Sequence, residues 1–246
     1  MRVMSLLLTF FVIFITSCTQ SPDVNQVLKN AVSAHGGEQF DQLEVTFDFR
    51  GTPYRLIKDG GKFRYERTRA DSSGNKILEG MDNNGAYKLI NGIEQSITSR
   101  EDSLLKYSIN AVRYFAVLPL QLINKAVVPE YIGSSEILGK KYHKIEITFR
   151  SEGGGSDYQD RYIFWFEQDT YRMDYFAYYY HVNGGGSRFR KVVNTRNFNG
   201  ILLSDQINYT SEKISTNIED YDKEFLAGNL KEVSQIKLEN LKVEKF

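Results

Sequence analysis

The chain has 246 residues, with 31 basic and 31 acidic side chains, a single cysteine, 16 tyrosines and 16 phenylalanines. The formal net charge of zero lacks the basic excess of nucleic-acid-binding proteins, so we expect no nucleic-acid partner. One cysteine cannot form an internal disulfide, so stability must come from core packing. Tyrosine and phenylalanine favour strands, and the composition therefore indicates a mainly β protein.

Residues 1–17 have the features of a secretory signal. Arg2 supplies a positive charge, and the apolar run LLLTFFVIFI is shorter than the ~20 residues of a membrane-spanning helix. The segment ends in Ile-Thr-Ser-Cys, which resembles the bacterial lipobox, where the thiol is acylated and the chain is cut before the cysteine. We therefore predict a lipoprotein signal peptide over residues 1–17 and lipid attachment at Cys18. The alternatives are a plain signal peptide with an unrelated cysteine, and a short uncleaved anchor.

Acylation of Cys18 would make a membrane the partner of this protein, because more than one acyl chain, such as palmitate, anchors a protein stably. No aspartate follows the cysteine, which in the sorting logic of Gram-negative bacteria favours the outer membrane. We expect a cell-envelope protein at the outer membrane, facing the periplasm. Removal of residues 1–17 would take away one charged side chain, that of Arg2, and leave a formal charge near −1.

A polar tether, residues 18–25, leads into a segment of helical periodicity. Small and aliphatic side chains recur at three- and four-residue spacing from Val24 to Ala34. Asp23 can cap the first turn, and the glycines at 36 and 37 can end the helix in a left-handed turn. His35 at this end would suit the helix dipole as a cation.

Strands and a second helix follow. The sequence VTFDFRG alternates between apolar and polar residues, which is typical of an antiparallel sheet with one wet face. The turn signals Asp59-Gly60-Gly61 and Asn91-Gly92 predict two hairpins. From Leu104 to Ala116 an apolar face returns at helical spacing, and Pro119 should end that helix.

Long aromatic strands return from Tyr131 onward. Short turns at 168–170 and 198–200 alternate with two glycine-rich loops at 152–157 and 183–187. Every second turn of an up-and-down meander lies on the same edge, so we expect the two glycine-rich loops to be neighbours.

The strand YFAYYY, residues 175–180, should point large rings to both of its faces. One face is expected in the core, and the other under a helix, under a lipid or beside a membrane. The tail, VSQIKLENLKVEKF, predicts a last strand after a helical turn near residues 220–226.

These elements predict a mainly β (α+β) protein. About a dozen strands form a strongly curved antiparallel sheet or half-barrel, with two helices on its concave face, because long sheets curl and amphipathic helices cover an apolar face. No linker interrupts residues 26–246, which we expect to form a single half-barrel domain.

The order of these features resembles envelope lipoproteins of Gram-negative bacteria that share the half-barrel fold of the outer-membrane lipoprotein carrier and receptor. The opening AVSAHGGEQFDQLEVTFDFRG is similar to the start of many such proteins. The segments SINAVRYFAVLPLQLINKAV, GKKYHKIEITF and DYFAYYY, with the later GGGSRFR, resemble a narrower family without an assigned function, over most of residues 31–210. The resemblance implies an apolar cavity for acyl chains. No carrier-specific functional residue is matched, so none is transferred.

Candidate chemistry is sparse. The three histidines show no metal-ligand spacing, and the glycine-rich loops join strands without the pattern of a phosphate-binding loop, so we expect no metal and no cofactor. No catalytic residue is assigned. The candidate ligand-binding residues lie beside the two glycine-rich loops and are Asp157, Asp160, His181, Arg188 and Arg190.

Three functions follow from this reading. The first is an envelope lipoprotein that binds a lipid or other apolar ligand in the hollow of the half-barrel. The second is a structural or interaction lipoprotein without a ligand. The third is an envelope hydrolase or lyase that uses the acidic and basic residues near the loops. They rank in that order.

Overall fold

The computed structural model describes residues 21–150, 152, 159–181, 184–212 and 216–246. In this part of the chain no helix combines the length and the apolar character that a membrane span requires. The elements in chain order are α1 (Val24–Ala34), the 3₁₀ helix η1 (Gly37–Asp41), β1 (Gln42–Phe49), β2 (Thr52–Asp59), β3 (Lys62–Ala70), β4 (Lys76–Asp82), β5 (Gly85–Ile90), β6 (Ile93–Glu94), α2 (Ser99–Ala116), β7 (Val127–Ile137), β8 (Lys140–Phe149), β9 (Arg161–Glu167), β10 (Met173–Tyr180), β11 (Gly186–Phe198), β12 (Ile201–Ser211), the 3₁₀ helix η4 (Ile218–Asp220), α3 (Tyr221–Leu226), β13 (Leu230–Ile236) and β14 (Glu239–Lys245).

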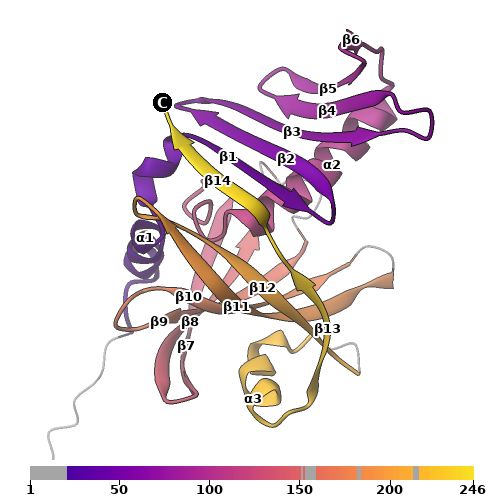
Figure 1. Cartoon of the computed structure of the whole chain (residues 1–246). Coiled ribbons are helices and arrows are strands. Elements are labelled where there is room, and N and C mark those ends of the chain that lie inside the picture. Colours follow the sequence, from indigo (N-terminus) through magenta and orange to yellow (C-terminus); the bar gives the residue numbers. More distant parts are fainter. Residues whose placement is uncertain (1–20, 151, 153–158, 182–183, 213–215) are drawn as a thin grey trace, which may run out of the picture.

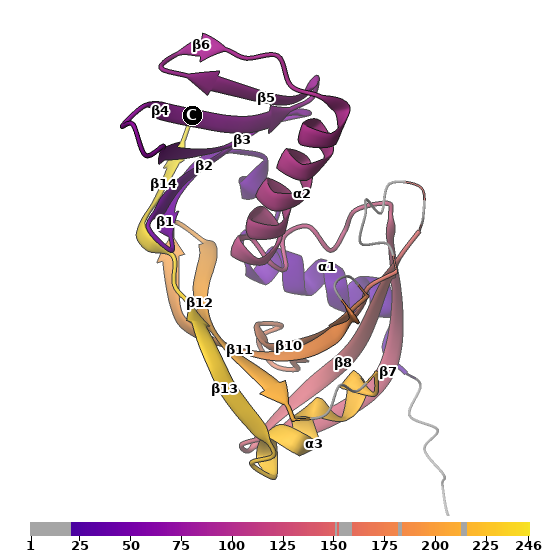
Figure 2. The same cartoon turned by 90° about the vertical axis from the view of Figure 1, so that its right-hand side faces the viewer.

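The described strands form two antiparallel sheets of seven strands each. The first has the order β14-β1-β2-β3-β4-β5-β6 and the second the order β13-β12-β11-β10-β9-β8-β7. Figure 1 shows that the C-terminal segment passes from the second sheet, as β13, to the first, as β14. Figure 2 shows the two sheets as one open arch with α1 and α2 inside it and α3 outside. The expected curved, mainly β half-barrel with two inner helices is confirmed.

The tail differs from the single last strand that its sequence pattern predicts. It divides into β13 and β14 because a polar cluster holds the backbone between them. Asp205 accepts the amide of Leu238 at 3.0 Å, and Arg196 donates to the carbonyl oxygen of Leu238 at 2.8 Å. Arg196 also pairs with Asp205 at 2.6 Å. The helical turn expected before the tail is present as α3.

Helix α1 begins at Val24, so the last two residues of the expected 18–25 tether belong to the helix. Its start is fixed by Asp23, whose carboxylate accepts the amide of Asn25 at 3.0 Å. After the helix, Gly36 has a φ of +121°, and a Cβ there would lie 3.0 Å from the Cα of Ile201. Both the backbone conformation and this close approach require glycine.

His35, which follows α1, is buried, with 5% of its surface exposed. It donates from Nδ1 to the carbonyl oxygen of Ala31 at 2.8 Å and accepts the amide of Met173 at Nε2 at 3.4 Å. Burial lowers the pKa of His35 below its ordinary value. The expectation of a cation at the helix dipole is therefore wrong, because the ring is desolvated and its two nitrogens match a neutral imidazole.

Helix α2 starts in a capping box in which Thr98 and Glu101 each accept from the other's backbone amide. It ends at Ala116, before Pro119, as predicted. Its buried stripe is formed by Leu105, Ile109, Val112 and Ala116. The last three share a core cluster with residues of β1, β2 and β3. Leu104, expected on the apolar face, is 57% exposed and lies outside this stripe.

The second sheet is buried on both faces, which explains its aromatic strands. Phe164 and Phe176 face inward and pack with α1. Trp165 and Tyr175 face outward, under η4 and α3, where the rings of Tyr175 and Phe225 lie 5.8 Å apart. The two-sided pattern predicted for β10 is thus confirmed, and a helix covers each face.

Candidate ligand-binding site

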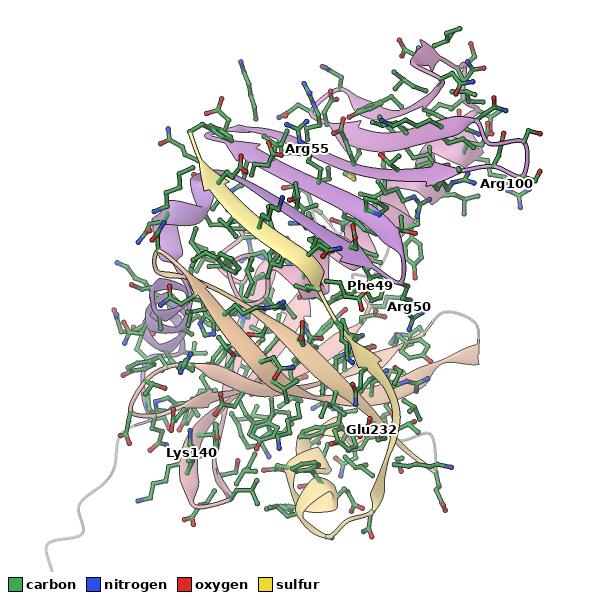
Figure 3. All side chains as sticks on the ribbon, in the orientation of Figure 1. Phe49, Arg50, Arg55, Arg100, Lys140 and Glu232 are labelled. Carbon is green, nitrogen blue, oxygen red and sulfur yellow. The ribbon has the colours of Figure 1, made fainter. Side chains whose placement is uncertain are left out.

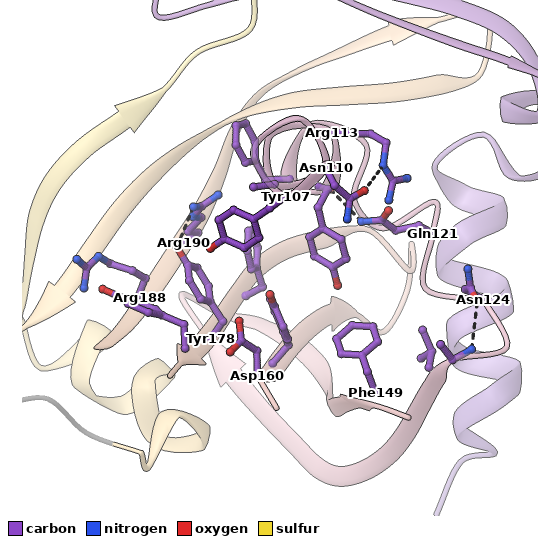
Figure 4. A pocket seen from close by; sticks show the side chains of 18 residues that line it. Tyr107, Asn110, Arg113, Gln121, Asn124, Phe149, Asp160, Tyr178, Arg188 and Arg190 are labelled. Atoms are coloured by element: carbon purple, nitrogen blue, oxygen red, sulfur yellow. Dashed lines mark hydrogen bonds between the residues drawn. The ribbon is translucent and has the colours of Figure 1, made fainter. Parts of the chain in front are cut away.

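A cavity of about 510 Å³ lies between α2 and the concave face of the second sheet (Figure 4). Its lining comes from α2, the segment that follows it, and the strands β7 to β11. The lining residues are Tyr107, Asn110, Ala111, Arg113, Tyr114, Phe115, Gln121, Asn124, Ala126, Val127, Phe149, Asp160, Tyr162, Phe176, Tyr178, Tyr180, Arg188 and Arg190.

Aromatic rings form much of the cavity wall. Tyr162 lies in the middle of this set, with ring centroids 5.6 Å from Tyr114, 5.8 Å from Phe149 and 5.6 Å from Tyr178. These rings come from α2, β8, β9 and β10, so one continuous aromatic surface joins the helix to the sheet. Such a surface suits the apolar part of a ligand.

Arg190 is the most buried cation of the described lining, with 9% of its surface exposed. It stands opposite Phe176 in the pairing of β10 with β11, so it points into the arch. Its guanidinium lies 5.1 to 5.5 Å from the ring centroids of Phe115, Phe176 and Tyr178. It donates to Gln206 at 2.8 Å and to the hydroxyl of Tyr178 at 2.9 Å, whereas its buried Nε has no hydrogen-bond partner among the described residues.

Arg188 lies two residues earlier on β11 and therefore on the same face as Arg190. It is half-buried, and its guanidinium lies 5.7 Å from the ring centroid of Tyr180. It donates to the carbonyl oxygen of Ser187 at 2.7 Å and to the hydroxyl of Thr210 at 3.3 Å. A third lining arginine, Arg113 of α2, donates to the side chain of Asn110 at 2.9 Å.

Among the described lining residues, one is acidic. This residue, Asp160, is buried, with 8% of its surface exposed. Its carboxylate lies 3.6 Å from Nδ1 of His181, whose side chain is 49% exposed and does not line the cavity. Of the five candidate residues, the structure brings three into the lining, places His181 at its border, and leaves Asp157 outside the described residues.

The glycine-rich loop at 152–157 lies largely outside the described residues, whereas 184–187 of the second loop are described, as are the strands that flank both loops. Arg161 at the start of β9 pairs with Tyr179 near the end of β10. The bases of the two loops are therefore adjacent, as the meander argument requires. This pairing is what brings Asp160 close to His181.

The lining residues of α2 were missed by the sequence reasoning. Tyr107, Asn110 and Tyr114 recur at three- and four-residue spacing, beside the buried stripe of the same helix. That spacing indicates that the three side chains share one face of the helix. It does not indicate which element this face meets, because the packing of α2 on the first sheet is what turns the face toward the second sheet.

Three arginines against one aspartate make the described lining basic. No three histidine, cysteine, aspartate or glutamate side chains of the described residues come together in a way that could hold a metal ion. The arrangement offers cationic donors and an aromatic wall, which is the chemistry of a binding pocket.

The fold and the site together define a half-barrel protein with an internal, aromatic and basic cavity. The chain belongs to the family of unknown function DUF6503, whose model matches residues 2–238. This agrees with the resemblance of the sequence to a narrower family without an assigned function. No curated protein matches the sequence.

Several solved structures are similar to this chain. A LolA-superfamily protein from Nitrosomonas europaea has 12% identity and a TM-score of 0.49, over 92% of this chain and 93% of that one. A DUF1329-family protein from Desulfovibrio piger has 10% identity and a TM-score of 0.38, over 89% and 92%. The lipoprotein LppX from Mycobacterium tuberculosis has 9% identity and a TM-score of 0.29, over 66% and 91%. Each TM-score is below 0.5, so these similarities carry no argument about the function of this chain.

Proposed function

We propose that this protein is a lipid-anchored cell-envelope protein that binds a lipid or other apolar ligand in the cavity between α2 and the second sheet. The observation that carries the proposal is the cavity itself. Its volume of about 510 Å³ falls within the roughly 300–1,000 Å³ of small-molecule sites.

The anchoring part of the proposal is carried by the sequence. A signal peptide over residues 1–17, acylation of Cys18 and attachment at the outer membrane, facing the periplasm, follow from the lipobox pattern. A single folded domain over residues 26–246 would then present the cavity to the periplasm at the end of a short tether.

A hydrolase or lyase activity has little support in the geometry. The pair Asp160 and His181 lies 3.6 Å apart, which exceeds hydrogen-bond distance, and the histidine is half exposed. The three lining arginines are permanent cations and cannot act as general bases. Binding is therefore the function that these side chains support best.

Native mass spectrometry of the purified chain tests the proposal. We expect a co-purified species of lipid mass that is released on denaturation. A clean apo mass from protein extracted under mild conditions, together with no uptake of added fatty acid or phospholipid, would favour the structural alternative.

A cavity-filling variant sharpens this test. Ala111 lies on the exposed side of α2 and also lines the cavity, so Ala111→Trp adds bulk to the ligand space with little effect on the core. We expect it to reduce lipid occupancy at least threefold. The matched control is Ser103→Trp, on the same helix but outside the lining, which should retain wild-type occupancy.

A further inference from the structure

We propose that the ligand is an anionic amphiphile, with an apolar chain and a carboxylate or phosphate headgroup that Arg188 and Arg190 hold. This inference rests on the proposed function and specifies its substrate class. Both headgroups share the chemistry that matters here, a compact anion with several acceptor oxygens.

The first argument is the spacing of the two arginines. They are neighbours on the inner face of β11, and residues two apart along a strand are separated by about 6.5–7 Å. Two long guanidinium side chains at that spacing can contact the same small anion. Figure 4 shows both on one side of the cavity, with Phe149 on the other, so a headgroup held by the arginines leaves its chain facing the aromatic wall.

The second argument is the missing counter-charge. Outside the cavity lining, the half-buried arginines of the described chain each have a carboxylate partner: Arg67 with Glu79 at 2.8 Å, Arg161 with Glu219 at 2.9 Å, and Arg196 with Asp205 at 2.6 Å. By contrast, no carboxylate of the described residues forms an ion pair with Arg188 or Arg190. Burying a cation without an anion is costly, and a bound anionic headgroup would offset that cost.

The third argument is how Arg190 is held. Gln206 bridges it to α2, because the same amide accepts from Arg190 and donates to the carbonyl oxygen of Phe115 at 3.0 Å. Three aromatic rings lie against the guanidinium and attract its charge. Its position is therefore preorganised, which lowers the entropic cost of binding an anion.

The experiment uses residues 18–246 with Cys18→Ser, which contain every residue of the described fold. A fatty acid with a terminal dansyl group serves as the fluorescent probe. Lauric acid, dodecyl phosphate, methyl laurate and dodecyltrimethylammonium compete for the site. We expect the two anions to displace the probe at least tenfold better than the neutral ester or the cation. The better of the two anions then identifies a fatty acid or a phosphate-bearing lipid as the source.

Charge-removing variants assign the binding to the two arginines. We expect Arg188→Gln and Arg190→Gln each to weaken laurate and dodecyl phosphate about tenfold and to leave methyl laurate unchanged. Arg190→Lys keeps the charge and should retain more anion binding than Arg190→Gln. The matched control is Arg100→Gln, an exposed position at the start of α2, remote from the cavity (Figure 3), which should behave as wild type.

The outcomes separate the two proposals. Equal binding of laurate and methyl laurate, unchanged in the arginine variants, would overturn the headgroup assignment and leave the proposed function standing. Failure of every amphiphile to bind a folded protein would overturn both. If Arg190→Gln does not fold, Arg188→Gln decides the question, because Arg188 is half-buried whereas Arg190 is buried.

Discussion

At the scale of single residues, burial decides the charge state of two histidines. His35 follows α1 and accepts a hydrogen bond from the backbone of β10. His143 lies between the rings of Tyr131 and Tyr171, with a centroid distance of 5.9 Å to each. Desolvation lowers the pKa of both below 6.5. Each ring is therefore neutral in the folded protein at neutral pH.

This pair predicts a loss of stability in acid. Below pH 6.5 the unfolded chain binds protons that the folded chain does not, so the stabilisation is complete above pH 6.5 and decreases as the pH falls. We expect urea unfolding to give a lower free energy of unfolding at pH 5 than at pH 7.5. His35→Gln should make that difference smaller.

The control for this prediction is Ser103→Gln, an exposed position of α2. It changes no ionisable side chain and should leave the pH dependence unchanged. An equal pH dependence in wild type and His35→Gln would show that His35 does not contribute to it.

At the scale of secondary-structure elements, a cluster of polar side chains stabilises the break between β13 and β14. Asp205 is buried and accepts from both Arg196 and the backbone of Leu238. This carboxylate satisfies the hydrogen bonding of a backbone amide and of a guanidinium at the point where the chain passes from one sheet to the other. The two sheets are joined at this point through a few charge-assisted hydrogen bonds.

Loss of this carboxylate should destabilise the protein. We expect Asp205→Ala to lower the free energy of unfolding by about 2 kcal/mol, since the buried amide of Leu238 loses its acceptor and the half-buried Arg196 loses its charge partner. Chemical denaturation measures the change. Lys223→Ala removes an exposed partner of Asp220 and should leave the free energy of unfolding nearly unchanged. A similar small effect for Asp205→Ala would mean that water replaces its contacts.

At the scale of the whole molecule, the cavity belongs to neither sheet alone. Helix α2 packs its buried stripe on the first sheet, and its adjacent stripe of Tyr107, Asn110 and Tyr114 lines the space above the second sheet. The arch therefore creates a ligand-sized space only when both sheets and α2 are in place. Any change in the angle between the sheets would alter the volume of that space.

The anchor is a prediction at this same scale. We expect Cys18→Ser in the full chain to abolish incorporation of radiolabelled palmitate and to remove the protein from the outer-membrane fraction, because the acylated sulfur is the proposed attachment. Ser17→Ala keeps a small residue before the cysteine and should be labelled as the wild type is. Labelling of the serine variant would contradict the lipobox assignment.

The sequence by itself determined the local structure of this protein. Strand alternation put Arg188 and Arg190 on one face, the turn signals gave the hairpins, and the meander placed Asp160 near His181, because local hydrogen bonding and one-sided burial leave a short-range pattern.

Only the tertiary structure decided which of those faces meet. It divided the strands into two sheets, turned the stripe of Tyr107, Asn110 and Tyr114 on α2 toward the second sheet, and buried His35 as a neutral ring. Each of these features depends on packing between segments far apart in the chain, such as the contact of Ile201 with Gly36. The periodicity of a sequence does not indicate which distant segments pack together.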